Sequence, residues 1–81
     1  MGRYYFHIRS GGQVIVDHEG ADFPDTDAAR REALASARQI VAEAIRYGNE
    51  DAPEEFVIAD SEGRELEIVP FATVLPKGLK Y

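Results

Sequence analysis

Residues 4–17 read YYFHIRSGGQVIVD, and this stretch decides the fold. From Tyr4 to Arg9 successive side chains alternate between an apolar face and a more polar one, a period of two that is typical of a half-buried strand. Ser10-Gly11-Gly12-Gln13 follows, and glycine supplies the positive φ that tight hairpin turns require. Val14 to Asp17 then returns as a second strand. The sequence therefore predicts a β-hairpin at this end of the chain.

A helix is predicted after the hairpin and a connecting loop over residues 21–24. Asp25 or Thr26 can accept hydrogen bonds from the free amides of a first helical turn. The helix is expected to run from about Asp27 to Tyr47, and Gly48-Asn49 ends it. Its apolar residues fall on one side, which predicts that the helix lies on a sheet: Ala29, Ala33, Leu34, Ala37, Ile40, Val41, Ala44, Ile45 and Tyr47.

A second hairpin is predicted from Glu55 to Val69, with a tight turn at residues 61–64. Its first strand places Phe56 and Ile58 on one face. In its second strand Leu66 and Ile68 are expected to face inward, whereas Glu65, Glu67 and Val69 are expected to face outward. Pro70 ends this strand because it has no amide hydrogen for a ladder.

The resulting order is β-β-α-β-β, which predicts an α+β domain over residues 1–75 and a tail over residues 76–81. A four-stranded sheet with one long helix packed on one face is the simplest arrangement. Two strand orders remain open. If the first strand pairs with the third, the sheet is antiparallel, and if it pairs with the fourth, the sheet is mixed.

Composition narrows the class of protein. The 81 residues include no cysteine, which excludes a disulfide framework, a thiolate zinc site and a cysteine nucleophile. No apolar run of the length of a signal peptide or a membrane span is present, so we expect a cytoplasmic protein away from the membrane. A net charge of −6 opposes non-specific binding to nucleic acids.

No catalytic, cofactor-binding or metal-binding set is predicted. His7 and His18 could approach Asp17 and Glu19, but nothing in their spacing makes three or four ligands converge on a metal. No calcium loop, serine elbow or glycine-rich phosphate loop is present. We therefore expect a protein that is not an enzyme and that holds no cofactor.

One candidate interaction surface lies on the second half of the helix. A helix of this length spans about 32 Å, whereas a six-residue strand spans about 20 Å, so part of the helix is expected to extend past the sheet. The apolar residues in that part must be covered either by the tail (Phe71, Val74 and Leu75) or by another chain. They are Ile40, Val41, Ala44, Ile45 and Tyr47.

Two further surfaces are candidates. Tyr5, His7 and Arg9 are expected on the sheet face away from the helix, joined by Val57, Ala59 and Val69, and an aromatic and basic face of this kind can stack nucleic-acid bases. Arg31, Arg38 and Arg46 are expected along the outer side of the helix, where a basic strip could dock an acidic partner.

Several short motifs occur together along the chain. They are RYYFHIR at 3–9, D-x-E-G at 17–20, F-P-D at 23–25, the alanine-rich AARREALASAR at 28–38, DSEGREL at 60–66 and VPFA at 69–72. In this order they resemble a family of small proteins common in rhizobia and related alphaproteobacteria, known as a domain of unknown function. The resemblance covers about residues 3–74. It implies a β-β-α-β-β domain in a bacterial cytoplasm and supplies no activity, substrate or site residue.

From these observations we expect a non-catalytic domain that binds a protein partner or a second copy of itself. Two alternatives remain open. One is a nucleic-acid-associated regulator, similar to small antitoxins, that uses Tyr5, His7 and Arg9. The other is a small metal- or ligand-binding enzyme.

Overall fold

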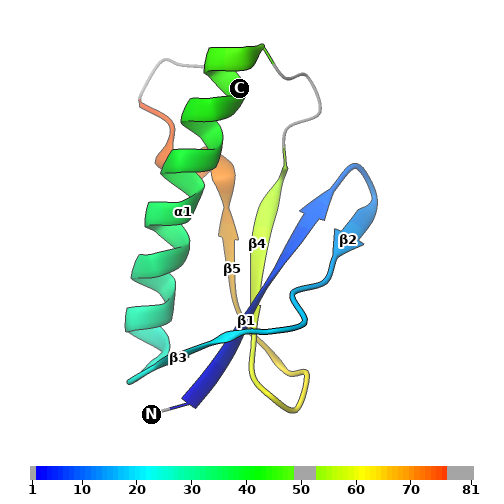
Figure 1. The fold of residues 1–81 in the computed structure, drawn as a ribbon, viewed down its shortest axis with the longest axis vertical. Helices are drawn as coiled ribbons and strands as arrows, with labels where there is room; N and C mark the ends of the chain where they lie inside the picture. The colour runs from blue at the N-terminus through cyan, green and yellow to red at the C-terminus, as the bar shows by residue number, and fades with distance from the viewer. Residues whose placement is uncertain (1, 49–52, 77–81) are drawn as a thin grey trace.

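The computed structural model describes residues 2–48 and 53–76. One long helix lies along one side of a twisted sheet, with a short 3₁₀ helix after the last strand (Figure 1). The predicted α+β class is confirmed. In chain order the elements are β1 (Gly2–Ser10), β2 (Gln13–Ile15), β3 (Ala21–Phe23), α1 (Thr26–Tyr47), β4 (Glu55–Ala59), β5 (Glu65–Pro70) and η1 (Phe71–Val74).

The sheet is antiparallel, with the order β2-β1-β4-β5, so the first hairpin pairs with the second through β1 and β4. Of the two orders left open by the sequence, the antiparallel one is present. The prediction of four strands is wrong, because residues 21–23 form β3 and pair with the start of β1, Gly2 opposite Phe23 and Tyr4 opposite Ala21. β1 is nine residues long and β2 only three, so β1 has unpaired length that β3 takes up.

Helix α1 begins and ends where its local sequence indicates. The Asp25 side chain accepts a hydrogen bond from Ala28 N at 2.8 Å and caps the first turn. Gly48 adopts the left-handed conformation, with φ 66°, and ends the helix. Ala29, Ala33 and Ala37 are at most 1% exposed, so their small side chains let the helix approach the sheet closely.

The core lies between α1 and one face of the sheet. Phe6, Phe56 and Phe71 form its aromatic centre, with the rings of Phe56 and Phe71 4.9 Å apart. Around them pack the small residues of α1 and apolar residues of β1, β4, β5 and η1. In a chain of this size a thin core of this kind is expected.

The predicted orientation of β5 is wrong. Val69 is 1% exposed and lies opposite Phe56 in the core, whereas Leu66 and Ile68 are 41% and 47% exposed. Glu67 lies on the helix side, where it forms an ion pair with Arg30 at 3.3 Å. Both sets of alternate residues in this strand contain an apolar side chain, so alternation alone does not show which set faces the helix.

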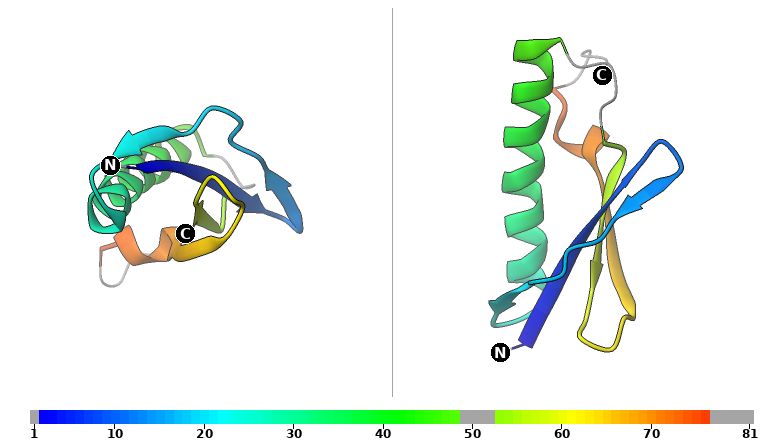
Figure 2. Two further views of the ribbon diagram at one scale, coloured as in Figure 1. Left: turned by 90° about the horizontal axis from the view of Figure 1, so that it is seen from below. Right: turned by 45° about the vertical axis from the view of Figure 1, so that its right-hand side comes forward.

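The chain after β5 folds back over the second half of the helix (Figure 2). η1 packs on α1, and Val74 and Leu75 are partly buried against the core. Val41 and Ala44 are buried, at 5% and 6% exposure, and Val41 belongs to the same core cluster as Phe71 of η1. Residues 77–81 of the predicted tail lie outside the part of the chain that the structure describes.

Candidate functional site

The sheet face away from α1, here called the open face, carries Tyr5, His7 and Arg9 of β1. The β1–β4 register places these residues directly opposite Ala59, Val57 and Glu55 respectively. The rings of Tyr5 and His7 stack on one another, with centroids 6.5 Å apart and planes 14° from parallel. The Arg9 guanidinium forms an ion pair with the Glu55 carboxylate, so the positive charge expected on this face is neutralised within the chain.

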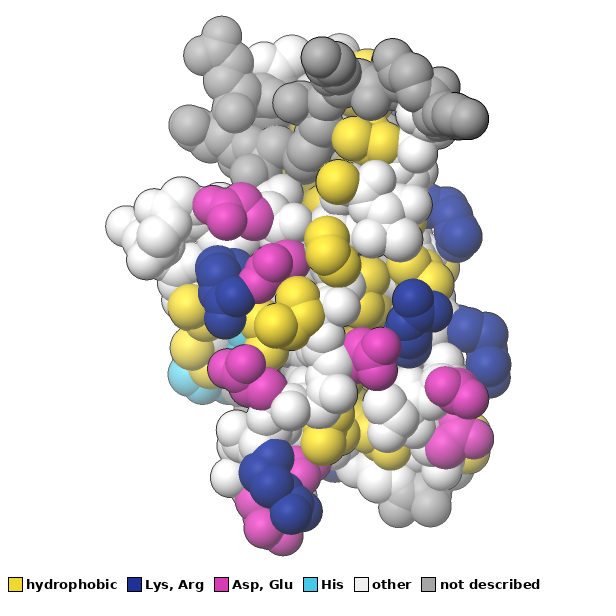
Figure 3. All heavy atoms as spheres, turned by 180° about the vertical axis from the view of Figure 1, so that it is seen from behind, with side chains coloured by type: hydrophobic (Ala, Val, Ile, Leu, Met, Phe, Trp, Pro, Cys, Tyr) yellow, Lys and Arg dark blue, Asp and Glu magenta, His cyan; other side chains and the backbone are white. Residues whose placement is uncertain are grey.

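The rest of the open face combines apolar residues with one acidic residue, Glu65, which lies opposite Ala59. Val57 and Ala59 form its floor and are 3% and 1% exposed, and Ile68 stands beside Val57 on β5. Val14 of β2 lies opposite Arg9 and is 53% exposed. Val69, expected on this face, lies on the helix side instead. Seen from behind, from the side on which β5 and η1 lie, hydrophobic side chains form a broken column with charged side chains on either flank (Figure 3).

The three arginines predicted as a strip on the helix are all exposed but do not form one line. Arg31 and Arg38 are seven residues apart and lie on the same side of a helix with 3.6 residues per turn. Arg46 is eight residues further on, which turns it by about 80° from Arg38. Its guanidinium lies 5.5 Å from the centroid of the Tyr47 ring.

The apolar part of the helix that was expected to overhang the sheet is divided by the tail. Ile40 is partly buried, and Val41 and Ala44 are buried. Ile45 and Tyr47 remain 55% and 68% exposed at the C-terminal end of α1. The candidate surface is therefore reduced to these two side chains.

The sequence D-x-E-G occurs twice, and both copies form turns stabilised by their aspartate. In the first, between β2 and β3, Asp17 Oδ1 accepts from the amides of Glu19 and Gly20, and Oδ2 accepts from Phe6 N at 3.0 Å. Asp17 N in turn donates to His7 Nδ1 at 3.1 Å. This side chain therefore supplies the amide of Phe6 with an acceptor in the part of β1 that lies between its pairing with β3 and its pairing with β2.

The electrostatics of the Asp17 carboxyl follow from this geometry. Partial burial of the Asp17 carboxyl raises its pKa, but the amide donors of Phe6, Gly20 and Glu19 and the nearby His7 imidazole together lower that pKa below its ordinary value. The charged form of Asp17 is therefore the one that holds this turn.

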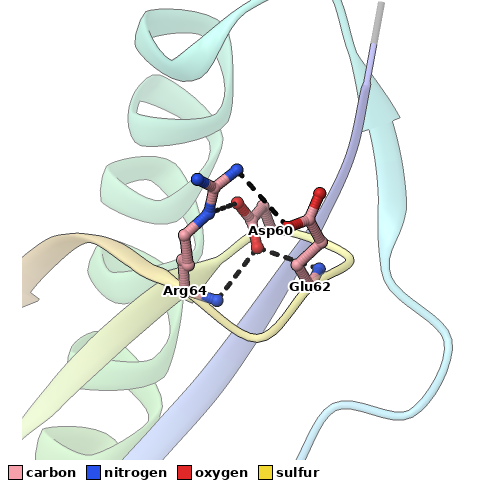
Figure 4. Close-up of polar contacts among 3 residues, drawn as sticks. All are labelled: Asp60, Glu62 and Arg64. Carbon is pink, nitrogen blue, oxygen red and sulfur yellow. Dashed lines mark hydrogen bonds and ion pairs between the residues drawn. The ribbon is translucent and has the colours of Figure 1, made fainter.

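The second D-x-E-G turn joins β4 to β5 (Figure 4). Asp60 Oδ1 accepts from Glu62 N and Arg64 N, both at 2.9 Å, and Arg64 Nε donates to Asp60 Oδ2 at 2.9 Å. The Arg64 amide is the largest influence on this carboxyl and, despite some desolvation, the Asp60 pKa is lowered. The repeated spacing was visible in the sequence, and it indicates two structural turns rather than a pair of reactive carboxylates.

No candidate metal site is present in residues 2–48 and 53–76. Within these ranges no three histidine or acidic side chains lie close enough to hold a metal ion, so His7, His18, Asp17 and Glu19 do not form such a group. Sequence reasoning missed a different feature, the three consecutive exposed residues Val14, Ile15 and Val16. The feature of the sequence that could have revealed them is the uncharged run between the glycine turn and Asp17.

A family model described as a domain of unknown function, DUF6894, matches residues 3–72. The chain belongs to the DUF6894 family. The DUF6894 match includes all of β1 except Gly2, all of the other strands, α1 and both D-x-E-G turns, and it ends within η1. No curated protein and no solved structure matches the chain. Of the parts of this DUF6894 domain that the structure describes, no helix combines the length and the apolar character needed to cross a membrane.

Proposed function

We propose that the chain is a non-catalytic protein-interaction domain that binds through the uncovered side of its sheet. One observation carries this proposal. Three of the large exposed apolar side chains belong to this side of the sheet: Val14, which lies opposite Arg9, Ile68, which lies opposite Val57, and Leu66, two residues before Ile68 on β5.

The chemistry of the open face supports a protein partner. The centre of a protein–protein interface is apolar and depleted of unpaired charge, with polar groups at its rim. Here Leu66 and Ile68 of β5 supply adjoining exposed apolar groups, and the Arg9–Glu55 ion pair lies to one side with its charges already matched. Exposed apolar groups that adjoin each other in this way are typical of interaction sites.

The same geometry argues against the nucleic-acid alternative. Proteins that bind single strands combine a positive groove with aromatic rings that are free to stack on bases. The Arg9 charge is paired with Glu55, and Tyr5 and His7 already stack on each other. A protein partner in the cytoplasm of an alphaproteobacterium, the setting that the sequence resemblance implies, is therefore our proposal.

Photo-crosslinking in the cells of origin tests this proposal. A photoreactive phenylalanine analogue is placed at Ile68 on the open face or, as the control, at Ala35 on the exposed outer side of α1. We expect a discrete protein adduct from position 68 and a much weaker one from position 35. Equal yields from both positions, or no protein adduct from position 68, would overturn the proposal, as would crosslinking of position 68 to nucleic acid instead of protein.

A further inference from the structure

We propose that two copies of the chain associate by antiparallel pairing of their β2 strands. This inference goes beyond the proposed function, because it concerns the β2 edge of the sheet and not the open face. It starts from a comparison of the strands at the margins of the sheet. β5 lies at one margin, and β2 and β3 lie along the other, both paired to β1.

Two of these three strands carry features that prevent further pairing. β3 contains Asp22, which forms an ion pair with Arg3 at 3.3 Å, and Pro24 follows it. β5 contains two glutamates, ends at Pro70 and has an irregular register opposite Ile58 and Ala59. Charged residues, proline and irregular pairing are the usual means by which proteins keep the edge of a sheet from binding another strand.

β2 has none of these features. Residues 11–16 read GGQVIV, without charge or proline. Val14, Ile15 and Val16 are 53%, 58% and 49% exposed. Within the ranges that the structure describes, β2 pairs with β1 alone. Its shortness is its one protection, and it limits how much pairing the edge can support.

The backbone of β2 has one residue available for a new strand. Ser10 and Gln13 flank the two-residue turn Gly11-Gly12, whose φ angles of 56° and 81° are both positive, as the common two-residue hairpin turn requires. The residues that flank such a turn form a hydrogen-bonded pair, and pairs alternate along an antiparallel ladder. Arg9 and Val14 are therefore a non-hydrogen-bonded pair, and Val14 N–H and C=O point away from β1.

A second copy of the chain fits this edge because the edge is self-complementary. Val14 is the β2 residue whose backbone N–H and C=O point away from β1. A two-fold antiparallel pairing through these groups has a single register, in which the N–H of each Val14 donates to the C=O of the other. Gln13 then lies opposite Ile15 of the second copy. Each copy has a net charge of −6, and the uncharged run 11–16 lets two copies meet without placing like charges in the strand contact.

The size of the contact predicts weak association. Three half-exposed side chains on each copy bury far less than the roughly 1,600 Å² of a standard interface. The pairing is therefore expected to form at high protein concentration. Because the net charges repel one another, it should strengthen as salt screens them, opposite to the salt dependence of nucleic-acid binding.

Analytical ultracentrifugation of the chain from about 10 µM to about 1 mM tests the pairing. The unmodified chain should show a monomer–dimer equilibrium that shifts toward dimer between about 0.05 M and about 0.5 M salt. Val14→Lys should weaken association by about tenfold or more. Ile68→Lys and Ile45→Lys place the same charge on the other exposed apolar surfaces and should change it less than about twofold. Circular dichroism checks that each variant is folded, which is expected because all three positions are exposed.

The outcomes separate this inference from the proposed function. A chain that stays monomeric at about 1 mM overturns β2 pairing, as does equal loss of association in Val14→Lys and Ile68→Lys. If Ile68→Lys alone weakens self-association, β2 pairing is overturned and the open face is the site of self-association. If the chain is monomeric yet position 68 still crosslinks to another protein in cells, the pairing fails and the proposed function stands.

Discussion

At the scale of single residues, Gly20 has the most restricted position among the glycines that the structure describes. Its φ is +68°, and a Cβ built on it would lie 2.8 Å from Tyr4 O and 2.9 Å from Tyr5 Cε2. The last residue of the first D-x-E-G turn therefore has to be glycine for two reasons, its backbone conformation and the closeness of β1. Gly63 holds the same place in the second turn with φ +84° and no neighbour within 4 Å.

This contrast predicts different costs for the same substitution. Gly20→Ala should lower the free energy of unfolding by about 3 kcal/mol, because left-handed strain adds to a clash with the β1 backbone. Gly63→Ala carries the strain alone and should cost about 1 kcal/mol. Urea unfolding of both variants measures the difference. Equal losses would show that β1 does not approach Gly20 as closely as the structure indicates.

Asp17 is the residue whose charge contributes most to the first D-x-E-G turn. Asp17→Asn should lower the free energy of unfolding by about 1–3 kcal/mol at neutral pH, because one of its two accepting oxygens is replaced by a donor. The lowered pKa gives the pH dependence a definite sign, since the charged form is favoured in the folded state. The contribution of Asp17 is complete at neutral pH and is lost as the pH falls below about 4 and through the folded-state pKa.

Urea midpoints recorded from neutral pH to about pH 3 follow this loss. The difference in stability between the unmodified chain and Asp17→Asn should shrink as the solution is acidified. Glu43→Gln, a change of the same charge on the exposed side of α1, serves as the control. A difference that stays constant over this range would contradict a role for the Asp17 charge.

At the scale of elements, β5 distinguishes the structure from the sequence prediction. Val69→Ala should cost about 2 kcal/mol, because it removes two buried methyl groups from contact with the core. Ile68→Ala removes a larger side chain from a half-exposed position and should cost about 1 kcal/mol or less. Urea unfolding of the two variants distinguishes the orientations, and the reverse order of costs would restore the predicted orientation of Leu66 and Ile68 toward the helix.

What the sequence could predict at this scale depended on how far apart along the chain the interacting residues lie. The ends of α1 were predictable because Asp25 and Gly48 act on backbone groups within a turn of themselves. The five-strand count was not, because β3 forms only through pairing with residues about 19 positions away. The facing of β5 was not predictable either, since it depends on pairing with β4, where Val69 lies opposite the buried Phe56 and the register is irregular opposite Ile58 and Ala59.

At the scale of the whole molecule, the structure has two layers, one helix and one sheet, and its shortest extent is 16 Å. The helix and η1 cover one face of the sheet and leave the other uncovered. The sequence identified the β1 residues of that open face. It did not show that the Arg9 charge is paired or which apolar residues near it are exposed. The ion pair of Arg9 with Glu55 depends on where β1 and β4 pair, and the exposed run at β2 depends on how β2 pairs with β1.

The most direct test of our account is amide hydrogen exchange at Val14, measured by NMR at a low and a high concentration of the chain. In the monomer Val14 N–H points to solvent, so it should exchange rapidly, whereas Ile15 N–H, bonded to β1, should be protected at both concentrations. At high concentration Val14 should gain protection as β2 pairs with β2 of a second copy. A Val14 exchange rate that is the same at both concentrations would contradict β2 pairing.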